Sequence, residues 1–170
     1  MNYATPPQYL SDFGIDEALQ LLRDEERLLT KQLLLDAIAG TWTGTPSAEE
    51  QAAGNAALAR LTAKLEATSS LMDGYLRAAV TLPVEAGASY YSNLRDCCLA
   101  LTRYALADDA ENATDRMDAI AKQWREWLRD VSARRVSLTA DDGSVAATGG
   151  GVLYGQAKSA YDWCRFGTVR

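Results

Sequence analysis

The sequence predicts a mainly α-helical protein, built as an antiparallel helical bundle, and three observations support this fold class. Apolar residues recur at spacings of three and four, the period of an amphipathic helix, over most of residues 1–135. Residues typical of helix starts precede these runs, and glycine or proline follows them. The later runs are joined by short loops, as in neighbouring antiparallel helices. In a chain of 170 residues these patterns predict one helical domain over residues 1–135.

The first two helices are predicted from their ends. Thr5 is expected to be the N-cap of a short helix, with Pro6 as its first residue and Gln8 as the reciprocal capping partner. Gly14 is expected to stop this helix in a left-handed conformation. A second helix is predicted to begin near Asp16 and to continue to Gly40.

A long central helix is predicted after the loop 41–46. Ser47 and Glu50 match a capping box at its start, and Pro83 is expected to end it. Trp42 in the preceding loop either plugs the core or forms an exposed contact. The helix carries a single apolar stripe, which is either a core seam or a coiled-coil dimer surface: Leu58, Leu61, Leu65, Thr68, Met72, Tyr75 and Ala79.

Two further helices are predicted over residues 88–107 and 113–134. Each has one apolar face at helical spacing. The faces comprise Tyr91, Leu94, Cys98, Leu101 and Ala105 in the first, and Met117, Ile120, Trp124, Leu128 and Val131 in the second.

The pattern changes after residue 135. Alternating residues on either side of Asp142-Gly143 predict a small β-hairpin over residues 136–148. A triple glycine then opens an extended C-terminal arm over residues 149–170. The arm is too short for a core of its own, and it is expected to dock either on neighbouring subunits or on its own bundle. Its aromatic residues are candidate partner contacts: Tyr154, Tyr161, Trp163 and Phe166.

Composition argues against catalysis and against metal or cofactor binding. The chain has no histidine, which removes the commonest general base and a common metal ligand. Its three cysteines are expected to act as small apolar residues, since Cys97 and Cys98 lie in an apolar helical run. Neither a catalytic residue nor a cofactor is therefore predicted.

Charge and hydropathy bear on partners and location. The 23 acidic and 17 basic residues give a formal charge of −6, which disfavours non-specific binding to nucleic acid. The sequence contains no apolar run of eighteen residues and no signal peptide, so we expect the chain to stay in the cytoplasm where it is made.

Two features of the helices have both a structural and a functional interpretation. The arginines Arg125, Arg129, Arg134 and Arg135 cluster near a helix C-terminus. There they either stabilise the helix dipole or form a patch that meets an acidic neighbour. Gly74, beside Tyr75, costs roughly 1 kcal/mol relative to alanine inside a helix. A second helix packed closely on it, within or between subunits, would explain this glycine.

Three segments resemble the small head–tail connector proteins of Mu-like phages and prophages. The resemblance covers about residues 1–22 and 58–135, and residues 23–57 look like an insertion. The residues that carry it are Tyr3-Ala4-Thr5-Pro6, Tyr9-Leu10, Phe13-Gly14, Glu17 and Leu21; then Leu71-Met72-Asp73-Gly74-Tyr75-Leu76 and Leu82-Pro83; then Leu94-Arg95-Asp96-Cys97-Cys98-Leu99-Ala100-Leu101-Thr102-Arg103-Tyr104.

This resemblance implies a structural virion protein, assembled in the host cytoplasm and located at the head–tail junction. It implies an adaptor ring, typically of twelve copies, that joins the portal protein to a tail-side neck or tail terminator protein. Double-stranded DNA would pass through the lumen without specific binding, and an acidic surface suits such a passage. The alternatives are a cytoplasmic helical module that regulates a host or phage protein, and an enzyme of unrecognised type.

Overall fold

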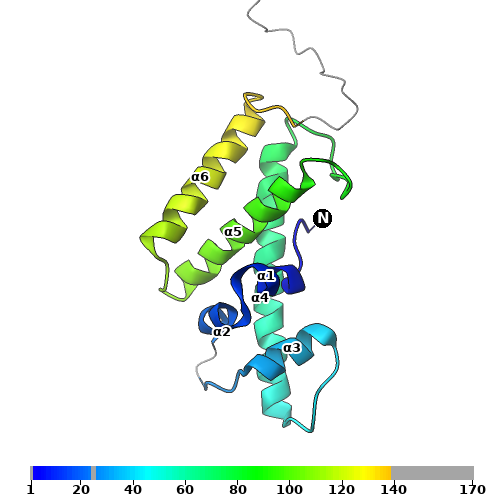
Figure 1. Cartoon of the computed structure of the whole chain (residues 1–170), viewed down its shortest axis with the longest axis vertical. Coiled ribbons are helices and arrows are strands. Elements are labelled where there is room, and N and C mark those ends of the chain that lie inside the picture. Colours follow the sequence, from blue (N-terminus) through cyan, green and yellow to red (C-terminus); the bar gives the residue numbers. More distant parts are fainter. Residues whose placement is uncertain (1, 24–25, 139–170) are drawn as a thin grey trace, which may run out of the picture.

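The computed structural model describes residues 2–23 and 26–138, and this part of the chain is mainly α-helical as predicted. It contains no β-strand within those ranges. The long helix α4 runs the length of the molecule, with α5 and α6 packed at one end and α3 at the other (Figure 1). The helices are α1 (Pro6–Phe13), α2 (Ile15–Leu22), α3 (Lys31–Ala39), α4 (Ala48–Leu76), α5 (Tyr91–Asp109) and α6 (Asp115–Ser132).

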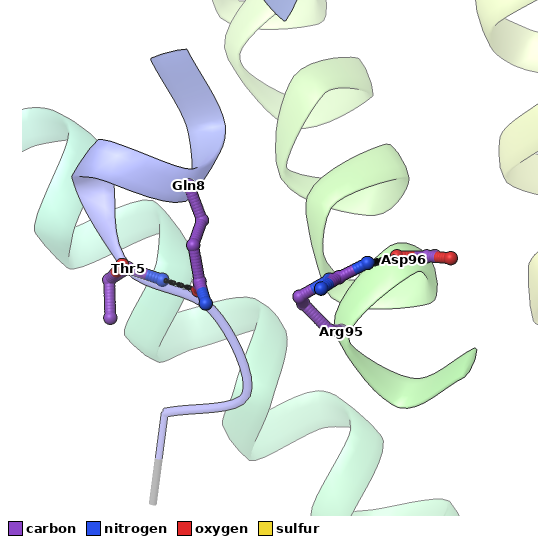
Figure 2. Close-up of polar contacts among 4 residues, drawn as sticks. All are labelled: Thr5, Gln8, Arg95 and Asp96. Atoms are coloured by element: carbon purple, nitrogen blue, oxygen red, sulfur yellow. Dashed lines mark hydrogen bonds and ion pairs between the residues drawn. The ribbon is translucent and has the colours of Figure 1, made fainter. Parts of the chain in front are cut away.

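The predicted cap of α1 is confirmed. Thr5 is the N-cap in extended conformation, and its N–H donates to Oε1 of Gln8 at 2.9 Å (Figure 2). Gly14 ends the helix with a φ of 81° but a ψ of 154°. It therefore needs the freedom of glycine, because its φ is positive, although its ψ places it outside the left-handed helical region that we predicted.

The prediction of a single helix from Asp16 to Gly40 is wrong, because the structure has two helices there, α2 and α3. The chain leaves helical geometry after Leu22 and enters it again at Lys31. Thr30 is the reason for the second start: it is extended, and its hydroxyl accepts a hydrogen bond from the Leu33 N–H at 3.3 Å. As the N-cap, Thr30 gives the Leu33 N–H an acceptor; in a continuous helix this N–H would instead bond to the backbone carbonyl four residues earlier.

A buried carboxylate holds the loop after α3. Asp36 is only 5% exposed and accepts hydrogen bonds from the Thr43 N–H at 2.8 Å and from Nε2 of Gln32 at 2.7 Å. The backbone hydrogen bond from Thr43 lowers the pKa of Asp36. The loop is thereby fixed in the position that directs Trp42 toward α4.

The capping box of α4 is confirmed, but the predicted end is not. Ser47 N–H donates to Glu50 at 2.7 Å, and Glu50 N–H donates to the Ser47 hydroxyl at 3.2 Å. The helix ends at Leu76, well before Pro83, so Ala79 lies in the following turn. The rest of the predicted stripe faces the core: Leu61, Leu65, Thr68 and Met72 are buried, and Leu58 and Tyr75 are half-buried.

The last two helices complete the core close to their predicted bounds. Thr114 caps α6, since its hydroxyl accepts from the Met117 N–H at 3.3 Å. Val136–Leu138 do not form a strand. The remainder of the predicted hairpin, to residue 148, and the whole arm 149–170 lie outside the described residues.

A buried tyrosine hydroxyl provides a test of this core. Tyr9 is fully buried, and within the described residues its hydroxyl has no hydrogen-bond partner. Burial raises the pKa of Tyr9 above its ordinary value of 10.0. The folded state therefore keeps the Tyr9 proton at a pH where the unfolded chain releases it. Because of this difference, the free energy of unfolding falls as the pH rises above about 10.

We expect Tyr9→Phe to stabilise the protein by about 1 kcal/mol at pH 7, because an unsatisfied buried hydroxyl is removed. We also expect it to raise the pH of alkaline unfolding. Urea denaturation at pH 7 and a circular-dichroism titration from pH 8 to 12 would measure the two effects. A lower stability at pH 7 would show that the hydroxyl has a partner in solution.

Candidate partner-binding surface

The described residues hold no group of metal-ligating side chains, and the two cysteines among them are buried. Within residues 2–23 and 26–138, no three His, Cys, Asp or Glu side chains are grouped so that they could hold a metal ion. Cys97 and Cys98 are fully buried, and burial raises the pKa of both thiols. The reactive thiolate is therefore disfavoured at both positions. No helix in the described ranges is long and apolar enough to span a membrane.

The arginines near the end of α6 make different contacts within the chain. Arg125 lies over the ring of Tyr104, 5.1 Å from its centroid. Arg134 donates through Nε and Nη2 to the carbonyl of Ala78, at 3.2 and 3.0 Å, and so ties the end of α6 to the turn after α4.

The other two arginines also differ from one another. Arg135 pairs with Asp130 at 3.1 Å. Arg129 is exposed, with no ion pair among the described residues. Intrachain contacts therefore account for three of the four arginines, and a partner role for the group stays a prediction.

Trp42 packs against α4 at a glycine that the sequence analysis did not single out. A Cβ added at Gly54 would lie 3.1 Å from Cη2 of Trp42 and 3.0 Å from the Leu33 carbonyl oxygen. The indole is half-buried, so it acts as a plug between α3 and α4. A partner contact by its exposed edge stays a prediction.

Gly74 has the opposite environment. It is exposed, and a Cβ there would meet nothing within 4 Å. The close packing predicted at Gly74 is therefore not found among the described residues, and packing between subunits remains a prediction. The neighbouring Tyr75 is half-buried and packs against the core.

A further ion pair lies in the first half of α5. Nε and Nη2 of Arg95 donate to Oδ1 of Asp96 at 3.0 and 2.8 Å (Figure 2). The hydrogen bond to Asp96 raises the pKa of Arg95, and Asp12 of α1 adds to this electrostatically. The pair is exposed, so it contributes charge to this surface more than stability.

An aromatic groove between α5 and α6 was missed by the sequence analysis. Trp124 and Trp127 lie edge to face, with ring centroids 5.5 Å apart and planes at 90°. Both indoles are half-buried, and together with Asn93 and Gln123 they line a hollow. The pattern had placed Trp124 inward, but Trp127 had no assigned role. Two tryptophans three residues apart on one helix were the available indication.

The hollow continues past Trp127 to the end of the described chain. A second hollow shares Asn93 and Trp127 with the first. We call the two together the Trp groove; its lining is Asn93, Gln123, Trp124 and Trp127, continued by Ser89, Tyr90, Val136, Ser137 and Leu138. A concave aromatic surface with amide groups at its edge is typical of a protein-binding site. The predicted contacts Tyr154, Tyr161, Trp163 and Phe166 lie outside the described residues.

The fold and this groove define a mainly helical protein with a concave aromatic surface between α5 and α6. The family model for Bacteriophage Mu, Gp36 matches residues 3–154, so the chain belongs to that phage protein family. The match includes residues 23–57, and their status as an insertion stays a prediction. A comparison with curated proteins found no match.

Proposed function

We propose that the chain is a structural virion protein that forms an adaptor ring at the phage head–tail junction. The observation that carries the proposal is membership of the Bacteriophage Mu, Gp36 family over residues 3–154. The ring would bind the portal protein on one side and a tail-side neck or tail terminator protein on the other. Twelve copies are the number that the resemblance to head–tail connectors implies.

Three properties of the molecule support a binding role over a catalytic one. The described residues present a half-exposed aromatic groove, which suits a partner surface. The buried cysteines are held in their unreactive thiol form. The net charge of −6 would keep the lumen of a ring from retaining the DNA that passes through it. The proposal therefore assigns the chain neither a catalytic residue nor a cofactor.

Light scattering of the purified chain with its phage portal protein tests the proposal. We expect a complex whose mass corresponds to a ring of the chain bound to the portal. The portal must be present because neighbouring subunits on its symmetric surface would raise the effective concentration of the chain. A chain that stays monomeric and unbound beside assembled portal would contradict the adaptor function.

Mass spectrometry of purified virions gives an independent test. A neck component is expected to be present in every particle at a fixed ratio to the portal protein. The chain could instead be absent from particles and co-purify with a host or phage protein that is not part of the virion. That result would favour a regulatory module.

A further inference from the structure

The Trp groove presents two large aromatic surfaces that the described residues leave incompletely covered. Trp124 and Trp127 are both half-buried, and their edge-to-face arrangement fixes the orientation of each ring. The side chains of Asn93 and Gln123 at the same hollow offer amide donors and acceptors. A peptide with several aromatic side chains and its own backbone polar groups matches this surface.

The chain itself supplies such a peptide. The described structure ends at Leu138, which lines the groove beside Trp127. The remaining 32 residues (170 − 138) include four aromatic side chains between positions 154 and 166. Since aromatic pairs contribute beyond the area that they bury, this segment is a fitting occupant for the two indoles.

The length of the connection favours exchange between copies. Tyr154 lies 16 residues (154 − 138) beyond the end of the described chain, so an extended connection can span roughly 50 Å. The groove takes only residues 123–127 from α6, and even the whole helix of 18 residues spans only about 27 Å. A connection this much longer than the groove can reach an adjacent subunit, and a contact within one chain would need far fewer residues.

We propose that the Trp groove of each copy binds residues 152–166 of a neighbouring copy. Such a contact joins two different surfaces, and repetition of a contact of that kind closes into a ring when the rotation between successive copies is a whole fraction of a turn. The inference rests on the proposed adaptor function, because it describes how adjacent subunits of the ring would be joined.

Disulfide cross-linking between two differently labelled copies tests this contact. One copy carries Gln123→Cys together with Cys164→Ser, and the other retains the native Cys164, which lies beside Trp163 in the segment. The two are mixed equally with the portal protein and oxidised. We expect a disulfide-linked dimer of the two copies on a non-reducing gel, because the thiol introduced on α6 and the native Cys164 would meet only across the contact.

The matched control places the cysteine one residue away on the other flank of α6. Lys122 pairs with Asp118 at 2.7 Å and lies about 100° around the helix from Gln123, outside the lining of the groove. Lys122→Cys with Cys164→Ser is expected to give severalfold less of the mixed dimer. Equal cross-linking from both positions would overturn the inference.

The oligomeric state of the same mixture separates this inference from the adaptor function. Ring assembly on the portal without the link between positions 123 and 164 would overturn the groove contact and leave the adaptor function intact. A strong link in a mixture that forms no portal complex would support the contact and contradict the adaptor function. A single copy with Gln123→Cys and the native Cys164 that links only within itself would also overturn exchange between copies.

Discussion

Replacing Gly54 with leucine is expected to lower the free energy of unfolding by about 3 kcal/mol, because the site has no room for a side chain. A single added Cβ would already lie 3.0 Å from the Leu33 carbonyl oxygen and 3.1 Å from the Trp42 ring. The backbone oxygen cannot rotate away, so the larger side chain must displace Trp42 or push α3 off α4. Urea denaturation followed by circular dichroism measures the loss.

Gly74→Ala is the matched control within the same helix. Gly74 is exposed and has nothing within 4 Å of its added Cβ, so only the helix preference of alanine acts. We expect the free energy of unfolding of this variant to rise by about 1 kcal/mol. A Gly54→Leu protein as stable as the parent, with unchanged tryptophan fluorescence, would show that α3 does not pack on α4 as described.

The helix ends of this protein could largely be predicted from the sequence. Thr5 with Gln8 and Ser47 with Glu50 form capping boxes because each pair is close in the chain, and local spacing is enough to predict such contacts. The break between α2 and α3 was missed for the opposite reason. Leu28 and Leu29 continued the apolar pattern through it, and the cap at Thr30 gave no stronger indication than other threonines.

The two glycines of α4 show why packing was harder to predict. Both interrupt an otherwise favourable helix, so sequence alone gave no reason to prefer Gly54 to Gly74. The difference arises from α3 and the loop that carries Trp42, which approach α4 only in the folded chain. The Trp groove was missed likewise, since a helical wheel places Trp127 at the edge of an apolar face but does not show that α5 leaves it half-exposed.

The segments that carried the family resemblance meet in the core of the fold. Tyr3 of the first segment donates its backbone N–H to the Ser69 hydroxyl at 3.2 Å and its own hydroxyl to Asp73 of the second. Burial, followed by the hydrogen bond to Asp73, raises the pKa of Tyr3. Arg103 of the third segment binds Glu17 of the first. The residues that carry the family resemblance therefore hold α1, α2, α4 and α5 together.

Arg103→Met is expected to lower the free energy of unfolding by about 2 kcal/mol, because Arg103 makes two contacts with the N-terminal helices at once. Its Nη2 donates to Oε2 of Glu17 at 2.7 Å, and its guanidinium lies 4.7 Å from the centroid of the Phe13 ring. The pair is only about a quarter exposed, at 28% for Arg103 and 24% for Glu17. The loss should therefore stay below the roughly 3–5 kcal/mol found for fully buried pairs, since water still reaches the abandoned carboxylate.

A double-mutant cycle separates the ion pair from the packing of Arg103. Glu17→Gln in the Arg103→Met background removes the unpaired carboxylate, so it should recover part of the lost stability, whereas in the parent it should be destabilising. Lys122→Met breaks the exposed pair with Asp118 and is the control for a charge lost at the surface. We expect this control to change the free energy of unfolding very little. If the Glu17 and Arg103 substitutions were additive, the pair would not be coupled. The N-terminal helices would then be held to α5 by Phe13, Tyr9 and their apolar neighbours alone.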